Sequence, residues 1–365
     1  MTVYLDHNAA APLRPAAAAA VAAAMGLIGN PSSVHDHGRR ARRLIEDART
    51  AVALSAGARP ADVVFTGSGT EACQLALRIG GRTRLLASAS EHAAVLQAPA
   101  GARLLPLNGD GILDLAALEA ALGADARDAI VAVMLANNET GTVQPVRKIA
   151  EIVHRAGGAL VVDAAQAYGK LALDLNELGA DAVAVSAAKI GGPLGVGAAI
   201  FRLGVAPQGL IVGGGQERGL RGGSENLIGI AGFGAAASEI DASIADQPRL
   251  KQLRDRMERA ILMIDAEAVA IGGAGPRLAN TAAIPMHGVE AATQVMAFDL
   301  AGYAVSAGAA CSSGKVAASH VLQAMGLPSP TVAATIRISL GLTTTAADTA
   351  GFVEAWRTLY NRKRQ

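Results

Sequence analysis

Short runs of apolar residues alternate along the chain with longer amphipathic stretches. The runs are rich in Val, Ile, Leu and Ala, end at Gly, Asp or Ser, and predict buried β-strands at residues 63–65, 84–88, 103–107, 129–135, 159–163, 182–186 and 198–202. Helical periodicity between them predicts helices at 38–54, 115–122 and 146–155. This pattern favours an α/β fold with a mainly parallel seven-stranded sheet flanked by helices. Ligands of such sheets bind at the carboxyl ends of the strands.

The pattern changes after about Gln216. A Gly-rich stretch precedes a long helical region from Leu227 to roughly Asp265, and short strands and helices follow to the end. Because 365 residues exceed the usual size of one domain, we expect two. The prediction is a large domain at 16–250 and a smaller α+β domain formed by 1–15 and 251–365.

Composition narrows the possible functions. The net charge is +1 with the charges well mixed, so no basic surface for nucleic acid or membrane is expected. The longest apolar stretch, residues 16–29, is shorter than a membrane span of roughly 18 residues, and the opening residues do not resemble a signal peptide. The two cysteines, Cys73 and Cys311, fit a reducing compartment. A cytoplasmic, soluble protein is expected.

The first predicted strands end in residues that suit a ligand. Gly67-x-Gly69 with Thr70 opens a helix and offers backbone N–H groups to an anion, although it also fits a plain turn or the start of a dinucleotide fingerprint, with Glu91 as its acidic residue. His92, beyond the next strand, could stack on an aromatic ligand or be purely structural.

Later strand ends carry an amide, a carboxylate and an amine. Asn138 could anchor a carboxylate or cap a turn. Asp163, after an apolar strand, needs a partner, such as a pyridinium nitrogen, unless it caps the next segment. Of the six lysines, Lys189 alone is expected in an apolar, Gly-rich stretch past a strand end, where a desolvated amine suits a Schiff base; a snorkelling surface lysine is the alternative.

The last third of the sequence contains two further candidate site residues, a cysteine and an arginine. Cys311 lies among small and polar residues, with Lys315 close in sequence, and predicts a thiol on a loop, whose reactivity would require the thiolate. Arg337 interrupts an apolar strand pattern, so it needs an anionic partner, and a substrate carboxylate would serve.

Taken in order, these motifs resemble the class V, fold-type I pyridoxal 5'-phosphate (PLP) enzymes, and specifically cysteine desulfurases of the nitrogen-fixation and iron–sulfur-assembly type. The resemblance spans nearly the whole chain. It is carried by residues 4–10, 29–35, 65–71, 91–92, 137–139, 162–166, 189–192, 213–226, 311–315, 319–322 and 337–341. It implies PLP as cofactor, L-cysteine as substrate, a homodimer and a sulfur-acceptor protein such as an iron–sulfur scaffold.

The resemblance also implies a role for each site residue. Lys189 carries PLP and moves protons, and Cys311 attacks the substrate sulfur to become a persulfide while alanine leaves. Asp163 pairs with the ring nitrogen, His92 stacks on the ring, and Gln166 with Asn138 contacts the ring oxygen. The phosphate is bound by Gly69, Thr70 and Ser186, with Ser224 of the partner subunit. The substrate carboxylate is bound by Arg337 with Asn8 and Asn138. No intrinsic metal site is implied, and a transient contact of Cys311 with an iron–sulfur cluster is a family-level expectation.

The sequence departs from the family pattern in places, and these departures leave other functions open. Ala188 stands where the family usually has His before the lysine, which predicts weaker PLP retention. The chain ends soon after Tyr360, so the acceptor and its docking are open. Other readings are a selenocysteine lyase or another class V PLP enzyme, a PLP-poor non-catalytic partner subunit, and a nicotinamide-dependent dehydrogenase. A metal site at His35-x-His37 is not expected, since further ligands are missing.

Overall fold

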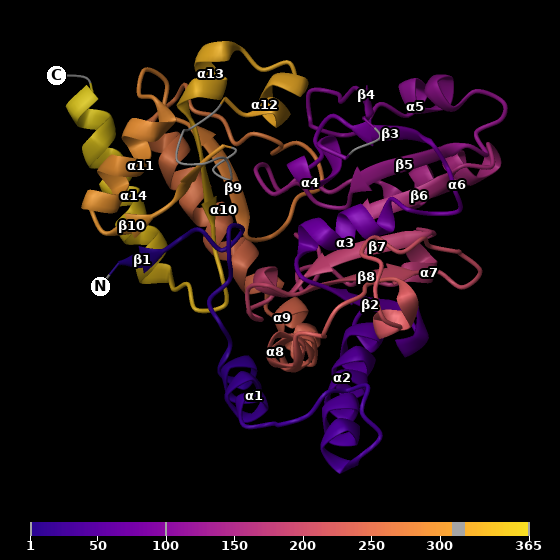
Figure 1. The fold of residues 1–365 in the computed structure, drawn as a ribbon. Helices are drawn as coiled ribbons and strands as arrows, with labels where there is room; N and C mark the ends of the chain where they lie inside the picture. The colour runs from indigo at the N-terminus through magenta and orange to yellow at the C-terminus, as the bar shows by residue number, and fades with distance from the viewer. Residues whose placement is uncertain (1, 99–100, 309–317, 364–365) are drawn as a thin grey trace.

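A seven-stranded sheet forms the centre of the larger half of the molecule (Figure 1). The computed structural model describes residues 2–98, 101–308 and 318–363. The strands, in spatial order, are β2 (Val63–Thr66), β8 (Gly197–Phe201), β7 (Ala182–Ser186), β6 (Ala159–Asp163), β5 (Ala129–Met134), β3 (Arg84–Ser88) and β4 (Arg103–Leu105). Neighbours pair in parallel except around β8, which is antiparallel to both β2 and β7. The sequence-based prediction of a mainly parallel seven-stranded sheet is confirmed.

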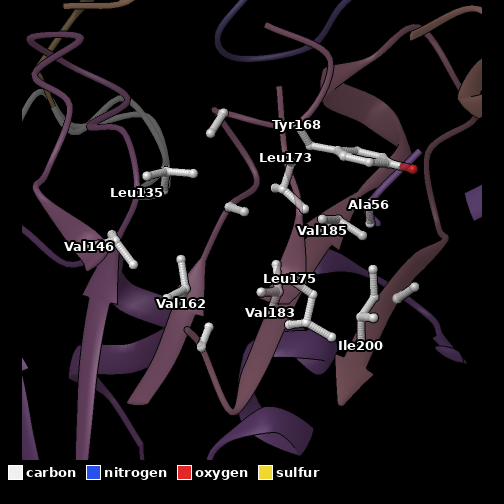
Figure 2. Close-up of a cluster of buried hydrophobic side chains, with 14 of the residues drawn as sticks. Ala56, Leu135, Val146, Val162, Tyr168, Leu173, Leu175, Val183, Val185 and Ile200 are labelled. Carbon is white, nitrogen blue, oxygen red and sulfur yellow. The ribbon is translucent and has the colours of Figure 1, made fainter. Parts of the chain in front are cut away.

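Both faces of the sheet are covered, which explains its almost continuous apolar strands. Along β6, Leu160 and Val162 join one hydrophobic cluster, while Ala159 and Val161 join another on the opposite face. Figure 2 shows side chains of the first cluster, where Tyr168 and Leu173 from the loop after β6 pack with residues of the strands. Within these strands, buried polar side chains such as Ser88, Asp163 and Ser186 stand at the strand ends.

Helices cover the sheet where their sequence has an apolar stripe. In α6 (Val146–Arg155) the buried residues are Val146, Ile149, Ala150 and Val153, the i, i+3, i+4, i+7 spacing of an amphipathic helix. The other helices before α8 are α1 (Pro15–Met25), α2 (Asp36–Leu54), α3 (Gly69–Ala76), α4 (Ala93–Leu96), α5 (Leu115–Leu122) and α7 (Leu175–Leu178), with short 3-10 turns η1 (Pro60–Asp62), η2 (Ala187–Lys189) and η3 (Gln216–Gly219).

The predicted helical region from Leu227 to roughly Asp265 is confirmed, and it consists of three helices. They are α8 (Leu227–Ala237), α9 (Ile240–Ala245) and α10 (Gln247–Ile264). Helix α8 is rich in glycine because it packs closely on α1 and α2: a Cβ at Gly234 would lie 2.6 Å from the Ala48 Cα.

The C-terminal half has its own core, built around Phe298, Phe352 and Trp356. Its strands are β9 (Thr281–Pro285), β11 (Ser306–Ala307) and β12 (Thr335–Ser339) in one sheet and β10 (Tyr303–Ala304) paired with β1 (Val3–Tyr4), and its helices after α10 are α11 (Ala291–Leu300), α12 (His320–Ala324), α13 (Ser329–Ala334) and α14 (Ala346–Lys363). The N-terminal strand thus belongs with the C-terminal half (Figure 1). Leu250 of α10 already packs in this core, so the packing changes close to the predicted boundary.

No single helix among the described residues is both long and apolar enough to cross a membrane. One bent pair, Leu227–Ala237 with Ile240–Ile264, passes the same test of length and composition, with a bend of 46°.

Candidate active site

Adjacent parallel strands deliver the predicted polar residues to one edge of the large sheet. Asp163 is the last residue of β6 and Ser186 is the last residue of β7, which pairs with β6 in parallel. Lys189 ends the 3-10 turn η2 that follows directly. Because parallel strands end at the same edge, the carboxylate, the hydroxyl and the amine share the region where such sheets bind ligands.

Asn8, from the N-terminal segment, ties several of the predicted site residues together. Its carbonyl oxygen accepts hydrogen bonds from Lys189 Nζ at 3.1 Å and from Gln166 Nε2 at 2.8 Å. Its own Nδ2 donates to the Asn138 carbonyl at 3.1 Å, and the same carbonyl accepts from Arg337 Nη1 at 3.1 Å. The structure therefore brings together five residues that are far apart in sequence.

The start of α3 forms an anion cradle with Ser186. Ser68 caps the helix by accepting a hydrogen bond from the Glu71 N–H at 3.1 Å. A Cβ at Gly69 would lie 3.0 Å from the Ser186 Cβ, so only glycine leaves this approach open. Exposed Thr70 follows in the first turn. A helix N-terminus flanked by hydroxyls fits a phosphate group.

Asp163 lies within a buried group of acidic and thiol side chains. Its Oδ1 accepts from the Ala165 N–H at 2.8 Å, and its side chain is hydrogen-bonded to the thiol of Cys73. Burial, followed by the charge of Asp163, raises the pKa of Glu91 well above its ordinary value. Glu91 is fully buried, which does not suit the ribose-binding acid of a dinucleotide site. Burial also raises the pKa of the Cys73 thiol well above its usual range, so Cys73 is a poor nucleophile.

His92 and Ser224 occupy more peripheral positions. His92 caps α4, and its Nδ1 accepts from the Ala94 N–H at 3.1 Å. His320, at the start of α12, contacts the Glu91 carbonyl through Nε2 at 3.0 Å, so the C-terminal half reaches this side of the site. Ser224 is exposed in the segment between η3 and α8.

Arg337 is buried in the middle of β12, and a carboxylate of the chain itself pairs with it. Its Nη2 donates to Asp6 Oδ1 at 2.6 Å. Its Nε is buried and has no hydrogen-bond partner among the described residues. The guanidinium therefore keeps a donor for a further acceptor. Asp6 is a partner that sequence reasoning missed, although it lies beside Asn8 in the same motif.

Lys170, which the sequence analysis did not single out, is more deeply buried than Lys189. Lys170 Nζ donates to Asn8 Oδ1 at 2.7 Å and to Gln166 Oε1 at 2.8 Å. Desolvation, and then the charges of Lys189 and Arg337, lower its pKa well below the ordinary lysine value. Lys170 and Lys189 line the same cavity of about 270 Å³. Lys170 directly follows Ala167 and Tyr168, which the fold buries, and a turn at Gly169, so its burial shows in the structure and not in a local sequence pattern.

Two further predictions concern thiol and metal chemistry. Cys311 and its neighbour Lys315 lie outside the described residues. His35 caps α2 by accepting from the Gly38 N–H at 3.2 Å, and its ring centroid lies 6.2 Å from that of His37. Within residues 2–98, 101–308 and 318–363, no group of three or more His, Cys, Asp and Glu side chains could hold a metal ion.

Fold and site together define an enzyme that binds its ligand at the carboxyl edge of a mainly parallel sheet. The aminotransferase class-V family model matches residues 3–352. The chain therefore belongs to the aminotransferase class-V family, which indicates a PLP-dependent enzyme.

Known proteins are similar to this one over most of its length. It is 42% identical to a cysteine desulfurase of Cereibacter sphaeroides, covering 95% of this chain and 92% of that protein. It is 38% identical to an IscS-like cysteine desulfurase of Mycobacterium tuberculosis, covering 96% and 94%. Among solved structures, the NifS-like protein of Rickettsia africae superposes with a TM-score of 0.92 at 32% identity, covering 99% of this chain and all of that one.

Proposed function

We propose that this chain is a PLP-dependent cysteine desulfurase that converts L-cysteine to L-alanine and leaves the sulfur as a persulfide on Cys311. The observation that carries the proposal is the network through Asn8, which links the amine of Lys189 to Gln166, Asn138 and the buried Arg337. An amine for the cofactor and a guanidinium for an α-carboxylate are thereby held in one connected site. The names of the 42% and 38% identical relatives support the substrate.

The residues at the sheet edge fit PLP. Lys189 is the amine that would hold the cofactor's aldehyde carbon, and Asp163 would pair with the ring nitrogen. The α3 N-terminus at Gly69 and Thr70, with Ser186, would hold the phosphate, joined by Ser224 of a second subunit. His92 would stack on the ring, and Gln166 would contact the ring oxygen. When bound, PLP supplies an electron-withdrawing ring that stabilises negative charge on the substrate carbons.

Arg337 would hold the substrate carboxylate. A buried guanidinium with an unsatisfied Nε offers a charge-assisted hydrogen bond in a site shielded from water. Asn138 and Asn8 assist: the Asn8 side chain is only 1% exposed, and its Nδ2 already bonds to the Asn138 carbonyl and to Thr281 Oγ1 at 2.9 Å. We therefore propose that Asn8 positions Asn138 and Lys189 through its hydrogen bonds to both residues.

Cys311 would take the sulfur. Its thiolate attacks the sulfur of the bound cysteine, an S–S bond forms, and the bond between that sulfur and the substrate β-carbon breaks. The electron pair of the broken bond stays with the carbon, which gains a proton from Lys189, so cysteine and a thiol become alanine and a persulfide. No external oxidant is needed. The persulfide then passes to an acceptor, which we propose to be a protein such as an iron–sulfur scaffold.

The assembly and location follow from this chemistry. A site that takes Ser224 from a second subunit requires a homodimer. With only two cysteines the chain has no disulfide framework and suits a reducing compartment, so we propose the cytoplasm. We also propose that residues 16–250 form the PLP-binding domain and that 1–15 with 251–365 form the small domain that carries the Cys311 segment and Arg337.

The test uses the full-length protein supplied with PLP and L-cysteine. We expect alanine and sulfide in equal amounts with a reductant, and one extra sulfur atom on Cys311 by mass spectrometry without it. Cys311→Ala should stop sulfide release while the cofactor still binds, and Lys189→Ala should prevent the borohydride-stable linkage to PLP. Unchanged sulfide release by Cys311→Ala would disprove the persulfide step and favour a lyase or another class V reaction. A protein that stays colourless with PLP would disprove the whole assignment.

A further inference from the structure

Lys170 is the most unusual buried group that the proposed chemistry leaves without a task. It is 9% exposed and lies just beyond the site residues of the β6 loop, with its amine directed at two amide side chains. Both acceptors are oxygens, Asn8 Oδ1 at 2.7 Å and Gln166 Oε1 at 2.8 Å. Lys170 therefore contacts two residues of the candidate site without belonging to its predicted set.

The surroundings favour an uncharged amine at this position. The charged groups that act on Lys170 are Lys189 and Arg337, both cations, and among the described residues no carboxylate forms an ion pair with it. The nearby imidazole of His7 is also kept neutral, chiefly because burial lowers its pKa to about 4. An uncharged amine has two N–H groups, and the two amide oxygens match that number. Lys170 can thus remain buried without a counter-ion.

The contact with Lys170 fixes which end of the Gln166 amide faces Lys189. With Oε1 held by Lys170, the Gln166 Nε2 donates to the Asn8 carbonyl, the same oxygen that accepts from Lys189 Nζ. A flipped amide would set its NH₂ against the Lys170 donor and its oxygen against the Asn8 carbonyl. The Gln166 NH₂ therefore lies beside the cofactor-binding amine, with a second N–H left for a ligand.

We propose that Lys170 is a positioning residue that locks the Gln166 amide so that its NH₂ group is offered to the negatively charged ring oxygen of PLP. This inference rests on the proposed function and extends it to a residue outside the predicted site. An N–H donated to that oxygen competes with the proton shared between the oxygen and the Lys189 nitrogen. A firmly held Gln166 therefore lowers the pH at which the bound cofactor loses that proton.

A purely structural role for Lys170 makes a different prediction. As a mere tie between the N-terminal segment and the β6 loop, Lys170 would affect unfolding and PLP retention but not the titration of bound PLP. The informative substitution is Lys170→Met, which keeps the length of the side chain, removes the N–H donors and adds no charge. Lys251→Met is the matched control, since Lys251 is exposed on α10 and pairs with Asp255.

The experiment titrates the absorbance of PLP bound to the full-length protein, in wild type, Lys170→Met, Gln166→Leu and the double variant. We expect Lys170→Met to raise the pH midpoint by about half a unit or more, roughly a threefold change in proton affinity. We expect Lys251→Met to titrate like wild type. In the Gln166→Leu background Lys170→Met should shift nothing further, because the coupling passes through Gln166. Thermal unfolding of the cofactor-free variants measures the structural contribution separately.

The outcomes separate this inference from the function it rests on. A wild-type protein that never becomes coloured with PLP overturns the proposed function. A coloured wild type whose midpoint equals that of Lys170→Met overturns the role of Lys170 alone. If Lys170→Met shifted the pH midpoint equally in the wild-type and Gln166→Leu backgrounds, the effect would not pass through Gln166, and that part of the inference would be overturned. A Lys170→Met variant too unfolded to bind PLP would show that Lys170 serves stability instead.

Discussion

The carboxyl edge of the large sheet and the core of the C-terminal half both bury side chains, but of opposite kinds. In the C-terminal core, the rings of Phe298 and Trp356 stack with centroids 5.8 Å apart, and Phe352 packs against Phe298 at 4.9 Å. At the sheet edge the buried groups are amines, carboxyls and amides, such as Lys170 and Glu91. One region gains stability from apolar contact, whereas the other holds titratable groups whose ordinary charge states are suppressed.

This difference separates residues that stabilise the fold from residues that serve the reaction. Burying a polar group costs free energy unless its hydrogen bonds are replaced, and the edge retains several that are only partly replaced, including Glu91 Oε2 and Arg337 Nε. Shifted pKa values and unsatisfied donors of this kind concentrate at functional sites. The comparison predicts that substitutions at the edge change activity more than stability, and substitutions in the C-terminal core do the opposite.

The sharpest test of the edge is Lys189→Ala. The substitution removes an amine that donates to the backbone carbonyls of Asn8 and Ala9, and we expect the fold to remain. We expect desulfurase activity to fall by more than about 10³-fold, because covalent attachment and proton transfer are both removed. Activity assays with circular dichroism of the same samples check this. Lys148→Ala, at an exposed site on α6, should retain full activity. A folded Lys189→Ala that keeps its activity would refute the role of this amine.

The sharpest test of the C-terminal core is Trp356→Ala. Trp356 is fully buried between α10, α11 and the sheet of this half, so truncation should cost about 3–5 kcal/mol of unfolding free energy. Urea denaturation measures this, and Arg357→Ala on the exposed face of α14 provides the control. The KM for cysteine of the fraction that remains folded should be unchanged. A large change in KM without a loss of stability would contradict the contrast between the two regions.

The sequence predicted the fold because its signals are local. The seven strands and helices such as Leu115–Leu122 each follow from apolar periodicity within a few neighbours. The breaks between α8, α9 and α10 were not predicted from the sequence.

The site was predictable only in part, for a related reason. Residues at strand ends, such as Asp163 and Lys189, could be proposed from their place in the chain, whereas the pairing of Asp6 with Arg337 joins residues 331 positions apart. Lys170 was missed because nothing local shows that its amine meets two amide oxygens. Contacts between distant segments are set by packing, which periodicity does not encode.

A smaller effect is expected from Arg337→Lys, which tests the carboxylate site. Lysine keeps the positive charge, but its donors share one nitrogen, so it loses the two separate Nη atoms that reach Asp6 and the Asn138 carbonyl and the planar pair that suits a carboxylate. We expect kcat/KM for cysteine to fall about 10- to 100-fold, mainly through KM. PLP binding should be preserved, as judged from absorbance. Unchanged kcat/KM would show that another group holds the carboxylate.

The last test concerns His7, where the polar edge meets the C-terminal half. Its ring packs against Gly341, where a Cβ would lie 2.0 Å from it, and Nε2 has no hydrogen-bond partner among the described residues. Burial is the largest cause that lowers the pKa of His7 from 6.5 to about 4. The fold therefore holds a neutral imidazole, while the unfolded chain takes up a proton below about pH 6.5.

The sign of the pH effect follows from that difference. The stability due to neutral His7 is present above pH 6.5 and is lost as the pH falls through 6.5 towards 4, by roughly 1–2 kcal/mol between pH 7 and pH 5. His7→Phe keeps a ring of similar shape that cannot take up a proton, so its unfolding free energy should fall less steeply over this range. His37→Phe, at an exposed position, should keep the wild-type slope. If the unfolding free energies of wild type and His7→Phe changed with pH in parallel, the His7 imidazole would be protonated in the folded protein as easily as in the unfolded chain. Burial at the sheet edge would then not suppress its charge.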